Sequence, residues 1–169
     1  MGLTFTRIRY MIYSIIHRNH YKQADWLRKH HVFAEMGKNV RFVPHLIPSD
    51  AAMIKIHNNV SIASNVQLTC HDTINTLINE IEDNPYLEPG QKLKDVFLPI
   101  EIFDNCFIGA ESTICAGVKI GPNVIVSAGS VVMKDVPPDS VVCGNPAKVV
   151  GKFSVSARMR AVQWLEEEQ

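Results

Sequence analysis

His71 is the side chain with the clearest capacity for acid–base chemistry in this sequence. It is the last of seven histidines, and it stands in the run Thr69-Cys70-His71-Asp72, where a regular repeat gives way to an irregular segment. An imidazole can act as a general base near neutral pH, and the junction of a rigid element with a loop would hold it beside a substrate. A histidine there can equally be a residue that only ends a strand, so the local sequence leaves both interpretations open.

Cys70 is not expected to act with His71 as a nucleophilic pair. Adjacent residues of an extended segment point to opposite faces, which separates the thiol from the imidazole. A metal site is not expected either, because its histidines would have to come from several neighbouring repeats and no histidine lies between Val96 and Val132. We therefore assign no metal.

Two lysines near the end of the repeats could bind an anion. Lys134 follows Met133, and Lys148 ends the run Gly144-Asn145-Pro146-Ala147-Lys148, so both stand beside turns made rigid by proline or opened by glycine. Such lysines can hold the phosphates of a nucleotide-like ligand as point charges. They can also be ordinary surface lysines at the point where the chain leaves the repeats.

Branched aliphatic residues recur every six positions in the second half of the chain. They are Ile102, Ile108, Ile114, Ile120, Val126 and Val132, and smaller partners follow the first five by four residues, at Cys106, Ser112, Val118, Val124 and Ser130. A helical period cannot keep such a stripe on one face, whereas two inward residues around one outward residue suit a short strand. Asn or Gly stands three positions after most anchors, as a tight corner requires; Glu111 is the unexplained exception.

Short strands that turn every six residues build a parallel β-helix, in which coils of 18 residues stack at about 4.8 Å. The same frame appears earlier at Ile56, Ile62 and Leu68, and residues 72–95 interrupt it. Outward residues 18 apart should stack, as Phe107 on Ile125 and Thr113 on Val131. These partly apolar columns favour contact with further copies of the chain or with a ligand.

The ends of the chain are expected to be helical. Apolar spacing predicts helices over Leu3–Ile16 and Tyr21–Phe33, and a final helix that Ser154 could cap. Such helices usually cover the open ends of a solenoid. For the N-terminal helix we favour that role over contact with a membrane. The arginines of this helix keep membrane contact as an alternative. The predicted division is therefore a helical segment 1–35, a β-helix domain 36–153 with the excursion 72–95, and a C-terminal helix 154–169.

Composition narrows the class of protein further. The 169 residues carry 17 basic and 17 acidic side chains, a balance that argues against nucleic acid as a partner bound by bulk electrostatics. The four cysteines show neither C-x-x-C spacing nor the density of a secreted disulfide scaffold. Reduced thiols and a cytoplasmic location are expected.

The combined motifs resemble those of hexapeptide-repeat acyltransferases. The matching residues are Ile108-Gly109, Ile120-Gly121-Pro122-Asn123-Val124, Ala128-Gly129-Ser130-Val131-Val132, Lys134-Asp135-Val136-Pro137 and Gly144-Asn145-Pro146-Ala147-Lys148. The similarity is greatest to the maltose and galactoside O-acetyltransferases and to relatives that acetylate surface polysaccharides, and it covers residues 36–153. It implies a mainly β fold: a left-handed parallel β-helix of hexapeptide repeats with N-terminal helices, one long loop excursion and a C-terminal helix.

The resemblance also implies a homotrimer that uses acetyl-CoA, with active sites between subunits. His71 occupies the place of the family's catalytic histidine, which favours the functional interpretation of this residue. The positions that match coenzyme A contacts are Ala110, Ala128, Met133, Lys134 and Lys148. Phe107 falls where relatives often carry a tryptophan near the active site, and Asp72 is a further candidate for substrate binding. The N-terminal helices match no acceptor-binding region of the small-sugar enzymes.

The predicted reaction is transfer of an acetyl group from acetyl-CoA to a hydroxyl of a sugar or surface-polysaccharide unit, as a step of polysaccharide biosynthesis. His71 would be the general base, and Asp72, Glu80 or Glu82 could orient it. One alternative is N-acetylation of an amino sugar carried on a nucleotide. A second, non-enzymatic alternative is a trimeric β-helix scaffold that binds a partner through residues 72–95.

Overall fold

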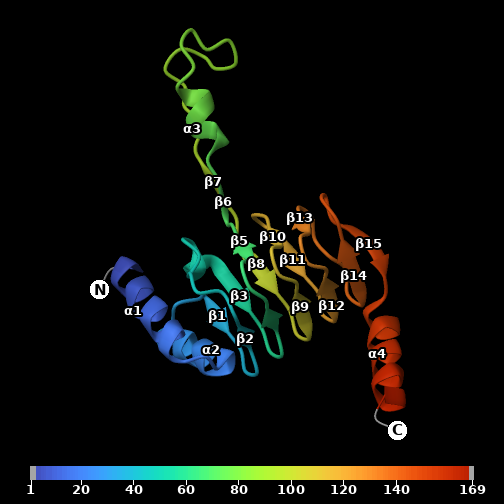
Figure 1. Cartoon of the computed structure of the whole chain (residues 1–169). Coiled ribbons are helices and arrows are strands. Elements are labelled where there is room, and N and C mark those ends of the chain that lie inside the picture. Colours follow the sequence, from blue (N-terminus) through green and yellow to red (C-terminus); the bar gives the residue numbers. More distant parts are fainter. Residues whose placement is uncertain (1–2, 168–169) are drawn as a thin grey trace.

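The computed structural model describes residues 3–167, which form a β-helix with helices at both ends (Figure 1). The helices are α1 (Leu3–Ile16), α2 (His20–Lys29), α3 (Ile74–Asn79) and α4 (Phe153–Glu167), with a short 3-10 helix at Ala51–Met53. The strands are β1 (Glu35–Met36), β2 (Arg41–Phe42), β3 (Ile54–Ile56), β4 (Ser61–Ile62), β5 (Gln67–Leu68), β6 (His71–Asp72), β7 (Val96–Phe97), β8 (Ile100–Ile102), β9 (Cys106–Ile108), β10 (Thr113–Ile114), β11 (Lys119–Ile120), β12 (Val124–Val126), β13 (Val131–Val132), β14 (Ser140–Cys143) and β15 (Lys148–Gly151). Residues 1–2 and 168–169 of the predicted terminal segments lie outside the described residues.

Three sheets form the walls of the β-helix. Their strand orders are β1-β3-β8-β11, β5-β10-β13 and β2-β4-β9-β12-β14-β15, and the strands are parallel except for the last pair, β14 and β15. The six predicted anchors are all buried, with at most 1% of their surface exposed, because each turn of the chain points one of them into the core. The predicted stacking of Phe107 on Ile125 and of Thr113 on Val131 is confirmed. The parallel β-helix is therefore confirmed, and its left-handed winding stays a prediction.

Asparagine ladders hold the corners together. The side chains of Asn39, Asn59, Asn105 and Asn123 form a chain of hydrogen bonds of 2.8–2.9 Å across four coils. All four residues have positive φ values between 54° and 60°, a conformation that Asn tolerates. Glu111 also lies in this region, at φ 63°, and its carboxylate accepts a hydrogen bond from Asn65 Nδ2 at 2.8 Å. Glu111 thus takes the acceptor place of an asparagine in a second, shorter ladder.

The excursion is an ordered arm that projects from the β-helix (Figure 1). Its base is the antiparallel pair β6 and β7, in which His71 faces Phe97, and its middle contains α3. The coils before and after the arm stack without a gap, since Ile54 pairs with Ile100 and Ile56 with Ile102. The arm therefore interrupts the sequence of the repeat but not the β-helix itself.

The helical ends differ in detail from the predictions. Asn19 caps α2 by accepting hydrogen bonds from two backbone amides, and the helix ends at Lys29, before Phe33, because His31 takes a positive φ of 50°. The predicted cap at Ser154 is wrong: α4 begins at Phe153, and Asp139 accepts hydrogen bonds from the Ser154 amide and hydroxyl. In the described part of the chain, no helix is long and apolar enough to cross a membrane.

Candidate active site

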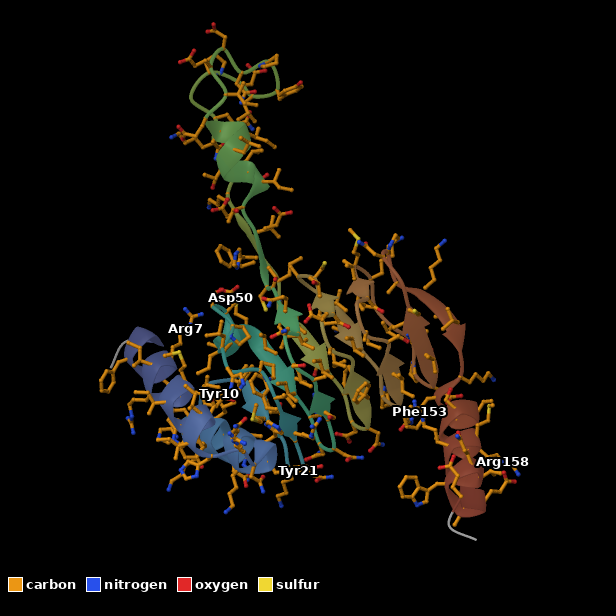
Figure 2. All side chains as sticks on the ribbon, in the orientation of Figure 1. Arg7, Tyr10, Tyr21, Asp50, Phe153 and Arg158 are labelled. Carbon is orange, nitrogen blue, oxygen red and sulfur yellow. The ribbon has the colours of Figure 1, made fainter. Side chains whose placement is uncertain are left out.

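His71 contacts a carboxylate at the base of the arm. Its Nδ1 lies 2.5 Å from Oδ2 of Asp50, which precedes the short 3-10 helix and lies beside the arm in Figure 2. The side chain of Asp50 is 15% exposed and that of His71 33% exposed, so the pair is shielded on one side and open on the other. The ring of Phe97 lies 6.0 Å from the imidazole and flanks it.

This contact fixes the chemistry of the imidazole. An ionised carboxylate only accepts hydrogen bonds, so Nδ1 carries the proton that is donated to Asp50. The other ring nitrogen, Nε2, then keeps its lone pair and can accept a proton. A carboxylate bonded in this way also stabilises the imidazolium that forms when Nε2 takes the proton. The arrangement is that of a general base with its orienting group.

Asp50, which the sequence analysis missed, takes the role suggested there for Asp72, Glu80 or Glu82. Asp72 follows His71 in an extended strand, and its carboxylate accepts a hydrogen bond from the Ile74 amide at the start of α3. Glu80 and Glu82 lie exposed on the arm. In the structure the first coil is 20 residues long, as the pair Arg41 and Ser61 shows, and Asp50 precedes His71 by about that number, so the spacing of 18 in the later repeats does not point to it.

Cys70 points into the core, away from His71. It has no exposed surface, and burial raises the pKa of its thiol, with Asp50 adding to the effect. A thiol held protonated in this way is a poor nucleophile. The structure therefore agrees with the exclusion of a pair between Cys70 and His71.

A hollow of about 370 Å³ is lined by the segments that come directly before Asp50 and shortly before His71, although neither of these two residues lines it. One wall is residues 44–49, which lead directly to Asp50, and the other is residues 65–69, which lead to His71. Polar side chains from both walls line it: His45, Ser49, Asn65, Gln67 and Thr69. Hydroxyl, amide and imidazole groups of this kind can exchange hydrogen bonds with a polyol.

Two of the predicted coenzyme positions share a corner of the β-helix with His71. The amide of Thr69 bonds to the carbonyl of Ile114, and the amide of Cys115 bonds to that of Val132, so residues 69, 115 and 133 form one column. Met133 and Lys134, both exposed, thus lie two coils along from the segment that carries His71, about 10 Å at the usual strand spacing.

The remaining predicted residues lie at other edges. Ala110 and Ala128 stack at the opposite end of the β5-β10-β13 sheet, joined by the bond from the Gly129 amide to the Ala110 carbonyl. Lys148 is exposed in β15, directly after Ala147, whose amide bonds to Val131 of that sheet. Phe107 is 41% exposed on a different sheet, so within one chain it is not brought to the histidine.

Comparison with known proteins identifies the repeat. Residues 99–134 match the family model described as the hexapeptide repeat of succinyl-transferase. The galactoside O-acetyltransferase of Escherichia coli (strain K12) is 35% identical over 119 residues, which cover 70% of this chain and 54% of that protein. The chain spans about half the length of the curated relatives it matches.

Solved structures show the same fold over most of the chain. A maltose O-acetyltransferase from Clostridium difficile 630 superimposes with a TM-score of 0.60 and 26% identity, covering 87% of this chain and 84% of that one. A galactoside acetyltransferase in complex with coenzyme A has a TM-score of 0.53 and 24% identity, covering 90% and 82%. The chain thus carries the hexapeptide repeat and shares the β-helix fold of these acetyltransferases.

Proposed function

We propose that this chain transfers an acetyl group from acetyl-CoA to a hydroxyl of a sugar or surface-polysaccharide unit. The observation that carries the proposal is the pair of His71 and Asp50 beside a hollow with a polar lining. The similarity to a galactoside and a maltose O-acetyltransferase supports the reaction class and the kind of acceptor. The catalytic unit would be the β-helix domain of residues 36–153.

In the proposed mechanism, Nε2 of His71 takes the proton from the acceptor hydroxyl. The oxygen then bonds to the acetyl carbonyl carbon, the bond from that carbon to sulfur breaks, and His71 returns its proton to the departing sulfur. Asp50 holds the imidazole in the required tautomer and offsets its transient positive charge. When bound, acetyl-CoA would supply the activated acetyl group as a thioester.

The donor would lie along the β5-β10-β13 sheet. Lys134 and Lys148 are exposed cations beside this sheet and would contact phosphates, while Met133 would pack against the chain of the donor and Ala110 and Ala128 would offer backbone groups. The coenzyme A complex of a galactoside acetyltransferase with the same fold supports this ligand class. These roles rest on the family resemblance and on the shared sheet.

The acceptor would enter the hollow between residues 44–49 and 65–69. Asp72 lies in β6 at the base of the arm and remains a candidate for substrate binding. Phe107 could contribute only across a subunit boundary, since it lies on another sheet. That placement fits the proposed cytoplasmic homotrimer, in which outward columns such as Phe107 on Ile125 would be covered by neighbours.

The test is a calorimetric titration with acetyl-CoA followed by an assay of free thiol with a panel of sugar acceptors. We expect saturable binding that weakens at least tenfold in the Lys134→Ala, Lys148→Ala double variant, and thiol release only with hydroxyl acceptors. Release with an amino sugar alone would assign N-transfer instead. If the wild type does not bind acetyl-CoA, the acetyltransferase proposal is wrong and the non-enzymatic scaffold remains as the interpretation.

A further inference from the structure

Helix α1 packs against the rest of the chain along one face and leaves an apolar face uncovered. Tyr10 and Ser14 are buried on the inner face, where the Tyr10 hydroxyl donates to the Pro44 carbonyl. The outer face exposes six large apolar side chains: Phe5 (50%), Ile8 (48%), Met11 (40%), Ile12 (51%), Ile15 (64%) and Ile16 (67%). Their spacing of three or four residues makes a continuous stripe along the helix. The stripe therefore faces solvent.

The charge around the stripe has one sign. The first 24 residues contain four basic side chains, Arg7, Arg9, Arg18 and Lys22, and no acidic one. The first carboxylate, Asp25, is paired with Arg28 at 2.6 Å. An apolar stripe with cations beside it and without anions is complementary to a surface that is apolar inside and anionic outside.

A groove between α1 and α2 continues this surface. It has a volume of about 420 Å³, and Arg9, Lys22 and Lys29 lie along it together with Tyr13, Asp25, Trp26 and His30. A second hollow of about 300 Å³ shares Arg9, Tyr13 and Trp26 and adds Ile12 and Ile16 of the stripe. The Trp26 ring stacks on those of Tyr13 and His30. Cations and aromatic rings thus adjoin the apolar stripe directly.

We propose that α1 and α2 dock this chain on an anionic membrane surface. α1 lies in the interface with its stripe below the phosphates, Trp26 and Tyr13 lie at headgroup depth, and the cations of the groove meet the lipid phosphates. A second copy of the chain is a poorer occupant, because a two-fold contact would set the same cationic surface against itself.

The docked helix is also joined to the candidate active site. Arg7 donates to the Ile47 carbonyl, and Ser14 and His45 share a hydrogen bond, so α1 is bonded to the segment that walls the hollow and leads to Asp50. Docking therefore sets this hollow close to the lipid surface. An acceptor carried on a lipid could then enter this hollow, and this consequence rests on the proposed function. The docking itself does not depend on the proposed function.

The experiment is flotation of the full chain with vesicles of phosphatidylcholine and phosphatidylglycerol, against vesicles of phosphatidylcholine alone. We expect binding to the anionic vesicles, weakened by high salt. Arg18→Gln with Lys22→Gln should lower the partition coefficient about fivefold per charge removed. Ile12→Ser with Ile15→Ser should lower the partition coefficient at least about tenfold. Both side chains are exposed, so their replacement leaves the core intact.

The exposed helix α4 supplies matched controls. Met159→Ser with Val162→Ser removes apolar groups of similar exposure (67% and 50%), and Arg158→Gln with Arg160→Gln removes two exposed cations. Both should leave vesicle binding unchanged. Absence of wild-type binding, equal binding to neutral vesicles, or equal loss in the α4 variants would overturn the proposal. If the wild type does not bind vesicles and Ile12→Ser with Ile15→Ser changes the oligomeric state, the proposal is overturned. The apolar stripe of α1 would then be a contact with a second copy of the chain. Each of these results is independent of acetyl transfer.

Discussion

The orientation of one imidazole depends on one carboxylate. Because Asp50 accepts the proton on Nδ1 of His71, an amide at position 50 would permit the opposite tautomer and leave a proton on Nε2. Asp50→Asn should therefore lower kcat for acetyl transfer by about 10²- to 10⁴-fold and leave the KM for acetyl-CoA within about threefold. Steady-state kinetics with acetyl-CoA as the varied substrate measure both.

The matched control for this variant is Glu80→Gln. Glu80 is exposed on the arm, so the same loss of charge should leave kcat nearly unchanged. Equal kcat values for Asp50→Asn and the wild type would show that the contact with His71 is only structural.

A second residue, Cys106, is expected to make the stability of the folded chain depend on pH. Burial raises its pKa from 9.0 to about 11, so folding favours the neutral thiol. The contribution of the Cys106 thiol to the free energy of unfolding is therefore fully present below pH 9. It is lost as the pH rises from about 9 to about 11, because the thiol of the unfolded chain ionises first. Two pKa units correspond to about 3 kcal/mol in the free energy of unfolding.

The measurement for Cys106 is urea unfolding at pH 8 and near pH 10.5, in the wild type and in Cys106→Ala. The variant should lose less stability between the two pH values than the wild type does. Cys143→Ala is the control, because Cys143 is exposed. Identical pH profiles of the wild type and Cys106→Ala would contradict the prediction.

At this scale the sequence could predict His71 but not its partner. His71 marks the end of a run of hexapeptides, which is visible in the sequence. Asp50 lies in the first coil, where neighbouring coils pair at 20 residues instead of 18, so the spacing learned from later repeats misplaces it. Glu111 is a similar case: its positive φ becomes intelligible only once the amide of Asn65 is seen beside it.

Among the elements, the corners of the coils are the most constrained. A Cβ on Gly109 would lie 2.5 Å from the backbone nitrogen of Ala128 in the next coil, so the two backbones would have to separate. Gly109→Ala should lower the free energy of unfolding by about 3 kcal/mol. Gly151→Ala is the control, since its Cβ would meet only Val141, at 3.9 Å. Urea unfolding of both variants gives the comparison, and a loss below about 1 kcal/mol for Gly109→Ala would contradict the packing described.

The strands could be predicted because a single physical rule generates them. Every sixth residue must fill the core, and the residue four places on must do the same, so the period is written in Ile108, Ile114 and their equivalents. Helix ends obey no such repeat. α2 stops where His31 changes conformation, and the start of α4 is bonded by Asp139, which precedes β14, a contact made only in the folded chain.

For the whole molecule, the sequence indicated a β-helix with an interruption and helical ends, but not how exposed these additions are. The arm and α4 expose most of their apolar side chains, and α1 exposes a stripe although its inner face is buried. A solenoid pattern describes what each coil buries and which side chains it turns outward, but it says nothing of the surfaces of the arm and the terminal helices, which lie outside the repeat. Those surfaces depend on which side chains of each helix the rest of the chain leaves uncovered.

The central claim is that His71 acts as the base for acetyl transfer, and it is tested most directly by comparing His71→Ala with the wild type in two measurements on the same samples. These are turnover of acetyl-CoA with a sugar acceptor and the calorimetric affinity for acetyl-CoA. We predict a loss of turnover of at least about 100-fold with an unchanged affinity, because in the proposed mechanism His71 moves the proton of the reaction, whereas other residues hold the phosphates of the donor. Turnover within a few fold of the wild type, or equal loss of turnover and affinity, would contradict the account.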